Sequence, residues 1–228
     1  MKSFALCVKN LRVLVAEKVV VESVNIKLDA GEVGVLKGAN GGGKSSLVNT
    51  IMGNPNYQIS EGLIELGGEN IGALAPDERA KRGLYVAWQN PVMIPGVKVF
   101  SLAKAMRESS GEQIKSLVAL KQELEKKAGG LGLTPQHLNR SINDGFSGGE
   151  RKRLELLWLL WSKAKVVLMD EIDSGMDEEG RRLMVEIVKK LSKQGIAFLI
   201  VTHYDSMISA LATSWIWEMK NGRLSARK

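Results

Sequence analysis

Residues 33–52 read VGVLKGANGGGKSSLVNTIM. The stretch starts with a short apolar strand at residues 33–36, and a glycine-rich loop leads from it into a helix predicted over Ser45–Met52. Residues Gly38–Ser45 fit the pattern G-x-x-x-x-G-K-[ST]. A strand before this pattern and a helix after it are the context in which it forms a phosphate-binding loop. We therefore expect such a loop here rather than a chance run of glycines.

The glycine-rich loop offers the groups that bind the phosphates of a nucleotide. Its glycines let successive backbone N–H groups turn toward phosphate oxygens, and the following helix adds the positive end of its dipole. Lys44 is expected to reach the β- and γ-phosphates, and the Ser45 hydroxyl to bind Mg²⁺. The predicted ligands are therefore ATP and Mg²⁺. The predicted contacts from this loop are Gly38, Ala39, Asn40, Gly41, Gly42, Gly43, Lys44, Ser45 and Ser46.

A second motif is an apolar strand that ends in two acids, Asp170 and Glu171. In proteins with a phosphate-binding loop, the first acid holds the Mg²⁺ shell, partly through water. The second can polarise the attacking water as a general base. The alternative is a solvated acidic turn, because Asp173 and Asp177 lie close by. The loop at Gly38–Ser45 favours the metal-site interpretation.

Residues Phe146–Glu150 read FSGGE and precede a predicted helix. Ser147 fits an N-cap, with Glu150 as its capping-box partner three residues later. A cap does not require Gly148 and Gly149, whereas close approach of the backbone to an anion at a helix N-terminus does. We expect both roles, a cap and an anion contact, from this motif.

Two polar residues follow apolar strands, Gln89 after one and His203 after another. Strand ends are where α/β folds place their sites. A single Gln or His at such a position is more often an ordinary surface residue, so only the other motifs favour a functional role. His137, on a polar helical stretch, is expected to be a surface residue.

The chain as a whole alternates predicted strands with predicted helices. This alternation predicts an α/β fold with a sheet that contains parallel strands. Residues 97–131, rich in Lys and Glu, are expected to form a helical lobe. The other predicted helices are 45–52, 77–82, 150–161, 178–193 and 204–212, and the predicted strands are 3–15, 19–28, 33–36, 59–66, 84–88, 166–169, 196–201 and 214–219. Asn221-Gly222 is a predicted hairpin turn.

The length and composition of the chain exclude several functional classes of protein. The 228 residues suit one domain with or without a sub-lobe, and the net charge of +7 is scattered without a basic block. We therefore expect no nucleic-acid binding but a basic surface that faces an acidic partner or the nucleotide. Cys7 is the only cysteine, which excludes an internal disulfide and a cluster built from this chain's thiolates alone. The sequence has no secretory signal and no membrane-spanning run, so we expect a cytoplasmic protein without membrane insertion.

The motifs, in this order, resemble those of the ABC ATPase family. The resemblance implies a P-loop RecA-like core with an antiparallel β subdomain and a helical subdomain. It implies a single domain over residues 1–228, with the core at 1–90 and 145–228 and the helical subdomain at about 91–144. The corresponding motifs are the Walker A loop Gly38–Ser45, the Q-loop residue Gln89, the signature Phe146–Glu150, the Walker B strand Val166–Asp170 with Glu171, the D-loop Ser174–Asp177 and the switch residue His203.

The same resemblance implies a role for each motif. The catalytic residues would be Lys44, Glu171 and His203, and the metal ligands Ser45, Gln89 and Asp170. Two copies would close head-to-tail, so that the signature of one copy completes the nucleotide site of the other. The remaining nucleotide contacts would be Gln89, Ser147, Gly148, Gly149, Glu150 and Asp177.

A finer resemblance is to SufC, the ATPase group of the Suf iron–sulfur cluster assembly system. The segments that carry it are Pro76–Ala80, Trp88–Val97, Gly149–Arg153, Asp170–Asp177 and Val201–Tyr204. The implied partners are SufB- and SufD-like scaffold proteins, and the implied function is ATP-driven rearrangement of that scaffold.

The alternative is the energy-coupling subunit of an ABC membrane transporter. A DNA-repair or translation ABC protein is disfavoured, because the chain has one ATPase half and no coiled-coil insertion.

Overall fold

The computed structural model describes residues 5–227 of the chain, with side chains up to Ser225. Contacts between residues divide the chain into two units. Among the described residues, the first unit contains residues 5–86, 164–171 and 188–227, and the second contains residues 87–163 and 172–187. The predicted boundaries of core and helical subdomain, which place residues 145–163 in the core, stay a prediction. Ser3 and Phe4, the predicted start of the first strand, lie outside the described residues.

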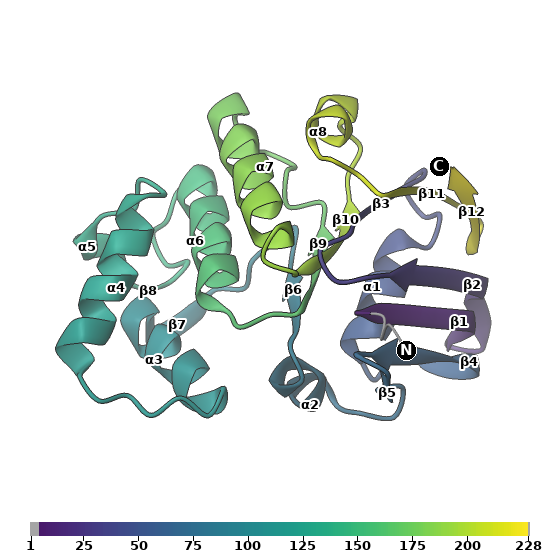
Figure 1. Ribbon diagram of the computed structural model, residues 1–228, viewed down its shortest axis with the longest axis horizontal. Coiled ribbons are helices and arrows are strands. Elements are labelled where there is room, and N and C mark those ends of the chain that lie inside the picture. Colours follow the sequence, from purple (N-terminus) through teal and green to yellow (C-terminus); the bar gives the residue numbers. More distant parts are fainter. Residues whose placement is uncertain (1–4, 228) are drawn as a thin grey trace. The chain divides into compact units, whose positions relative to one another are not determined.

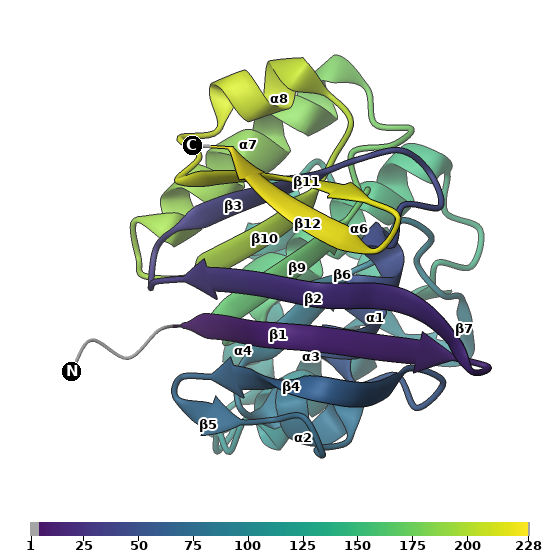
Figure 2. The ribbon, with the colours of Figure 1, turned by 90° about the vertical axis from the view of Figure 1, so that its right-hand side faces the viewer.

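The first unit contains a four-stranded antiparallel sheet in the order β2-β1-β4-β5 (Figure 2). Apolar and polar residues alternate along β2, so that one face of the sheet is buried. The register places Leu6 opposite both Leu28 and Leu66, and all three side chains are buried. The bounds are β1 Leu6–Val15, β2 Lys18–Leu28, β4 Gln58–Leu66 and β5 Glu69–Asn70.

A six-stranded sheet in the order β12-β11-β3-β10-β9-β6 forms the rest of the first unit's framework (Figure 2). Its central strands β3, β9 and β10 are parallel, and β9 and β10 are buried throughout, as expected for continuous apolar runs. This confirms the predicted α/β fold. The bounds are β3 Val33–Lys37, β6 Leu84–Ala87, β9 Val166–Asp170, β10 Ala197–Val201, β11 Trp215–Lys220 and β12 Arg223–Arg227.

The edge of this sheet is a hairpin, β11–β12, whose turn is Asn221-Gly222 as the sequence predicts. Both turn residues have positive φ, 49° and 76°, which is the conformation of a two-residue hairpin turn. On β11, the rings of Trp215 and Trp217 stack with centroids 6.0 Å apart and an interplanar angle of 13°. Trp217 fills the space over Gly34 of β3, where a side chain would collide with its ring.

The helices of the first unit are short. Helix α1 follows β3 directly, as predicted, and ends at Gly53, which adopts the left-handed conformation of a helix C-cap (φ 92°). The bounds are α1 Lys44–Met52, α2 Pro76–Lys81 and α8 Asp205–Ala210, with α7 (Glu178–Ser192) divided between the two units (Figure 1).

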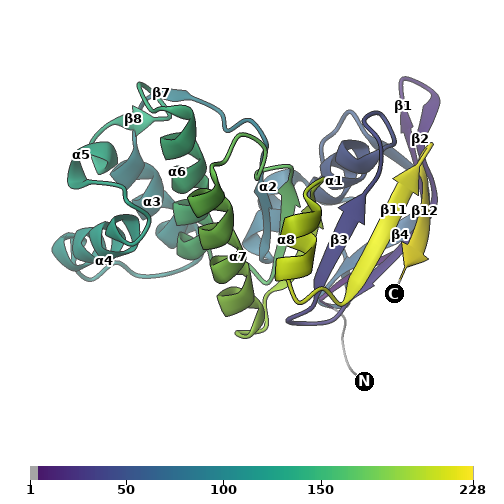
Figure 3. The ribbon, with the colours of Figure 1, turned by 90° about the horizontal axis from the view of Figure 1, so that it is seen from above.

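The second unit consists mainly of helices that pack on one another (Figure 3). The helical lobe predicted over residues 97–131 consists of two helices, because α3 ends before Gly111, whose φ of 80° is left-handed. The bounds are α3 Val99–Ser109, α4 Leu117–Gly129, α5 Pro135–Leu138, α6 Gly148–Trp161, β7 Ile94–Lys98 and β8 Ser141–Ile142.

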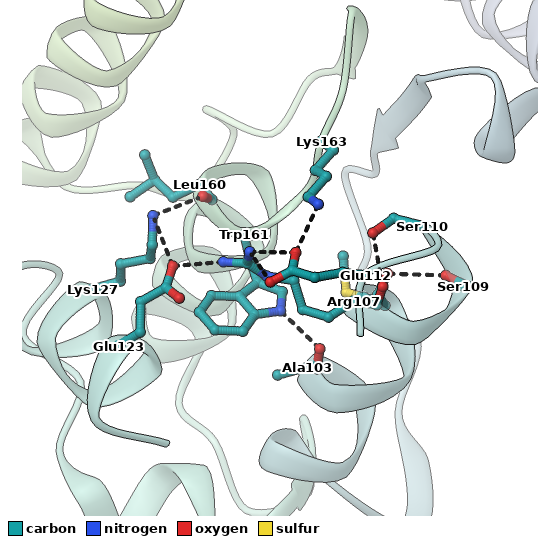
Figure 4. Close-up of polar contacts among 11 residues, drawn as sticks. Ala103, Arg107, Ser109, Ser110, Glu112, Glu123, Lys127, Leu160, Trp161 and Lys163 are labelled. Carbon is teal, nitrogen blue, oxygen red and sulfur yellow. Dashed lines mark hydrogen bonds and ion pairs between the residues drawn. The ribbon is translucent and has the colours of Figure 1, made fainter. Parts of the chain in front are cut away.

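A polar network centred on Arg107 joins α3, α4 and α6 (Figure 4). The Arg107 guanidinium lies 4.1 Å from the ring centroid of Trp161 and donates to the carboxylates of Glu112 and Glu123. The Trp161 indole N–H donates to the carbonyl oxygen of Ala103 at 2.8 Å. These contacts fix the connection between α3 and α4.

Among the described residues, none of the helices combines the length and the apolar character that crossing a membrane requires.

Candidate active site

The glycine-rich loop between β3 and α1 has a backbone that only glycine tolerates at several positions. Gly38, Gly41 and Gly43 have φ values of 143°, 77° and 107°. A Cβ at Gly38 would also collide with the carbonyl oxygen of Met219 on β11. By contrast, a Cβ at Gly41 would have open space around it, so this side of the loop is free for a ligand to approach. The loop therefore fits the phosphate cradle that its sequence predicts.

Lys44 follows this loop as the first residue of α1, and its side chain is 4% exposed. Its ammonium donates to the carbonyl oxygens of Gly38 at 2.7 Å and of Ala39 at 3.1 Å. The same Nζ lies 3.7 Å from Oε1 of Glu171. A buried cation thus lies beside the backbone that would bind phosphate, where an anionic ligand would complement its charge.

Ser45 and Asp170 bring two oxygens together. The Ser45 hydroxyl, on the first turn of α1, donates to Oδ1 of Asp170 at the end of β9, over 3.4 Å. Burial raises the pKa of the Asp170 carboxyl, whereas the hydrogen bond from Ser45 lowers it. A hydroxyl and a carboxylate are hard oxygen ligands of the kind that Mg²⁺ prefers when phosphate oxygens and waters complete its shell. The pair therefore fits the predicted metal site.

Glu171 and His203 meet because the strands that precede them are neighbours. Strands β9 and β10 pair in parallel with Asp170 opposite Val201, so their following residues emerge at the same edge. Nε2 of His203 lies 3.0 Å from Oε1 of Glu171. Glu171 has a φ of 50°, which is uncommon for a residue with a side chain, and its N–H donates to the Val201 carbonyl oxygen at 3.1 Å. The first unit thus brings the three predicted catalytic residues together.

A hollow of about 770 Å³ opens beside the loop and is lined by Gly38, Ala39 and His203. Two further lining residues, Lys37 and Asp205, form an ion pair there. Sequence reasoning missed both residues. The available signal was the position of Lys37 at the end of β3, because polar residues at strand ends face the site edge of a parallel sheet. Asp205 begins α8 and gave no such signal.

In the second unit, Gln89 follows β6, and its backbone carbonyl oxygen accepts a hydrogen bond from the ammonium of Lys152 on α6. Burial lowers the pKa of Lys152, and the nearby Glu155 and Asp173 raise it. Sequence reasoning missed Lys152, since a lysine within a helix gives no signal of its own.

The predicted capping box of Ser147 is confirmed. The Ser147 hydroxyl accepts from the Glu150 N–H at 3.3 Å, and the Glu150 carboxylate accepts from the Ser147 N–H at 2.8 Å. Cβ atoms built at Gly148 and Gly149 would meet nothing within 4 Å. Internal packing therefore does not require these two glycines, and their predicted contact with an anion stays a prediction.

Asp177 directly precedes α7, and its Oδ1 accepts from the N–H of Gly180 at 2.7 Å. This gives Asp177 a structural role as a helix cap. Its predicted contact with nucleotide stays a prediction, as do those of Gln89 and of residues 147–150. All of these belong to the second unit.

His137 was expected to be an ordinary surface residue, but its side chain makes specific contacts. Its side chain is only 14% exposed, and its Nε2 lies 3.3 Å from Oε1 of Glu150. The ring also packs near Phe146, with centroids 5.3 Å apart. The sequence did not reveal these contacts, because they join α5 to the loop before α6 through tertiary structure.

Comparisons with known proteins agree on the family. A family model described as "ABC transporter" matches residues 21–174. A probable ABC transporter ATP-binding protein of Streptococcus pyogenes serotype M18 is 37% identical, over 95% of this chain and 86% of the relative. A probable ATP-dependent transporter of Synechocystis sp. is 35% identical over 98% and 89%. Vegetative protein 296 of Bacillus subtilis is 33% identical over 98% and 87%.

Solved structures share the fold. An ATP-binding subunit of an ABC transporter superposes with a TM-score of 0.84 at 20% identity, covering 97% of this chain and 90% of that chain. A bacterial ABC transporter cassette in dimeric form gives a TM-score of 0.83 at 20% identity, covering 98% and 99%.

Proposed function

The chain belongs to the ABC transporter family of ATP-hydrolysing cassettes, and on that premise we propose that it couples ATP hydrolysis to the movement of a partner protein. The observation that carries the proposal is the meeting of Lys44, Glu171 and His203 beside the glycine-rich loop. A cation for the phosphates, a carboxylate for the water and an imidazole against that carboxylate are the groups that this hydrolysis needs.

We infer the following roles within the first unit. The N–H groups of the loop and the start of α1 bind the phosphates, and Lys44 exchanges its carbonyl partners for β- and γ-phosphate oxygens. Ser45 and Asp170 would hold Mg²⁺, which would supply positive charge to the phosphate oxygens.

Glu171 orients the attacking water and accepts its proton, while His203 holds the Glu171 carboxylate in place. The water oxygen forms a bond to the γ-phosphorus as the bond from that phosphorus to the β–γ bridging oxygen breaks, and ADP and phosphate leave.

We further propose that two copies close head-to-tail, so that Ser147, Gly148, Gly149, Glu150 and Asp177 of one copy contact the nucleotide held by the other. The open space at Gly148 and Gly149 supports this assignment. ATP binding would favour the closed pair, and hydrolysis would release it, which gives a cycle that can move a partner.

The names of the relatives support a transporter partner. The Streptococcus and Synechocystis proteins are named as probable transporter components, so the energy-coupling subunit of a membrane transporter is the first candidate. A SufB/SufD-like scaffold in iron–sulfur cluster assembly is the second candidate, supported by the segments Pro76–Ala80 and Trp88–Val97 of the sequence.

The test of the ATPase role is phosphate release by the purified chain with ATP and Mg²⁺. Glu171→Gln should lower turnover at least about 100-fold and keep ATP binding, since it removes the base and keeps the shape. The exposed substitution Glu186→Gln on α7 is the control. Turnover of Glu171→Gln at the wild-type rate would refute the role of Glu171, and absence of wild-type turnover would refute the proposed function.

Affinity purification of the tagged chain from its native cell distinguishes the two partner classes. An integral membrane protein in the eluate supports the transporter candidate. Scaffold proteins that contain iron and sulfide support the assembly candidate and would contradict the first.

A further inference from the structure

We propose that His137 is a positioning residue for the signature loop, which is the segment Ser147–Glu150. The geometry assigns to its ring the task of holding the Glu150 carboxylate, and through it the Ser147 end of α6. The inference rests on the proposed function, because it takes the signature loop to contact the nucleotide of a second copy.

The first step is the protonation pattern of the ring. The backbone N–H of Thr134 donates to Nδ1 of His137 at 2.9 Å, so Nδ1 is an acceptor and has no proton. The Thr134 hydroxyl lies 2.9 Å from the same nitrogen and can donate as well. In a neutral ring the one remaining proton is therefore on Nε2. The start of α5 thus sets the tautomer of His137.

The second step is where that proton points. Nε2 lies 3.3 Å from Oε1 of Glu150, so the N–H donates to the carboxylate. The other oxygen, Oε2, accepts from the Ser147 N–H at 2.8 Å. Both oxygens of Glu150 are thus engaged, one by α5 and one by the loop. These two contacts also lower the pKa of Glu150, with the Ser147 N–H as the larger cause.

The third step concerns the residue before the loop. The Phe146 side chain is buried, and the His137 ring lies against it at an interplanar angle of 50°. The Arg140 guanidinium carbon lies 5.8 Å from the Phe146 ring centroid, and the Arg151 Nε donates to the Phe146 carbonyl oxygen at 3.1 Å. Because Phe146 is held on several sides, a shift of the His137 ring would be transmitted to Ser147.

The consequence is a defined direction for the first N–H groups of α6. Gly148 and Gly149 are the first two residues of this helix, so their N–H groups have no acceptor within the helix. With Ser147 and Glu150 fixed, these N–H groups point away from the helix start toward any anion placed there. His137 acts on hydrolysis through this orientation and does not touch the nucleotide.

Two substitutions of His137 test the roles of its two ring nitrogens separately. His137→Asn places an amide oxygen near the position of Nδ1, so it keeps an acceptor for Thr134 and loses the donor to Glu150. His137→Gln is longer, and its amide N–H₂ can reach Glu150 from near the position of Nε2. The neighbouring exposed residue provides the control Gln136→Ala.

We expect ATP turnover of His137→Asn and His137→Ala to fall about tenfold, the factor for loss of one hydrogen bond to a charged group. His137→Gln and Gln136→Ala should keep turnover within about twofold of the wild type. The Kd of ADP, which in the proposed cycle is held by the open chain without contact from a second copy, should be unchanged in every variant when measured by calorimetry. The loss is therefore expected in kcat and not in nucleotide affinity.

Full turnover of His137→Asn alongside an active wild type would overturn this inference and leave the proposed function intact. An equal loss in His137→Asn and His137→Gln, or a loss that follows a lower Tm of the variants, would overturn it too, because it would indicate a merely structural role. An inactive wild type would contradict the proposed function and this inference together.

Discussion

Glu155 is an acid enclosed in the helical second unit, on the inner face of α6. Its exposure is 8%, and burial raises the pKa of its carboxyl to about 7, against the lowering effect of Lys152. An unfolded chain loses this proton near the ordinary value of 4.5. Between these two pH values the folded state holds a proton that the unfolded state has lost, so stability falls as pH rises through this window. Above pH 7 the full cost of the buried charge is present.

Glu155→Gln should therefore stabilise the protein at alkaline pH. The gain in free energy of unfolding is expected to be about 3 kcal/mol at pH 8 and below about 1 kcal/mol at pH 5. Urea denaturation at the two pH values measures it. Glu108→Gln, an exposed acid on α3 of the same unit, should show no such dependence. A gain that is equal at both pH values would contradict the raised pKa.

Single residues of the candidate site were predictable to different degrees. The pattern around Lys44 could be predicted, because the loop needs glycines at fixed spacings for its left-handed backbone. The contact of His203 with Glu171 could not, since it depends on the parallel pairing of β9 and β10. The role of His137 was hidden as well, because Thr134 and Glu150 become its neighbours only in the folded unit.

At the scale of the element, an arginine of α2 donates hydrogen bonds to the C-terminal end of α1. The side chain of Arg79 is buried and donates to the carbonyl oxygens of Thr50 and Ile51 at the end of α1. It also donates to the carbonyl oxygens of Gly72 and Leu74. A helix leaves its last carbonyl groups without partners in the helix. Arg79 donates to two of them, of which Thr50 also accepts from the Gly53 N–H at 3.0 Å.

Arg79→Met should destabilise the first unit by roughly 2–5 kcal/mol, because it leaves several buried carbonyl groups without a donor while the apolar stem is kept. Arg82→Met is the matched control, because its exposed ion pair with Glu69 contributes at most about 1 kcal/mol. Chemical denaturation measures both. An equally small effect of the two substitutions would show that water or a rearranged backbone replaces the Arg79 contacts.

Elements with a strong local signal were predicted well, and those set by distant contacts were not. Strand β3, the loop and α1 follow from sequence alone, as does the Asn221-Gly222 hairpin. The break between α3 and α4 was missed, because Lys and Glu continue the helical pattern through residues 110–116, where Gly111 ends the helix. The capping of α1 by Arg79 involves residues 28 and 29 positions apart, beyond any local pattern.

At the scale of the whole molecule, bound ATP with Mg²⁺ should raise the free energy of unfolding. A ligand that binds only the folded state stabilises it by about 2.7 kcal/mol at 100 times its Kd. For a chain of this size each kcal/mol raises Tm by about 2–4 °C. ATP with Mg²⁺ at that excess should therefore raise the Tm of Glu171→Gln by roughly 5–10 °C.

Differential scanning calorimetry measures this shift. Adding Lys44→Ala to Glu171→Gln should abolish most of it, because Lys44 is the cation of the glycine-rich loop. A shift that survives this second substitution would place the ATP elsewhere on the chain. The division into two units also predicts that the transition of the first unit moves more than that of the second, since the loop lies in the first.

The stacked pair Trp215 and Trp217 makes the two units optically distinguishable. These are the first unit's tryptophans, while Trp88, Trp158 and Trp161 belong to the second. Two closely stacked indoles couple their electronic transitions, so the near-ultraviolet circular dichroism of the pair reports on the hairpin edge of β11 and β12 alone. The intrinsic fluorescence of the chain with both residues of the pair changed to Phe would report on the second unit. The native chain therefore offers a label-free probe of the hairpin edge, and the doubly substituted chain offers one of the second unit, through a cycle of ATP binding and hydrolysis.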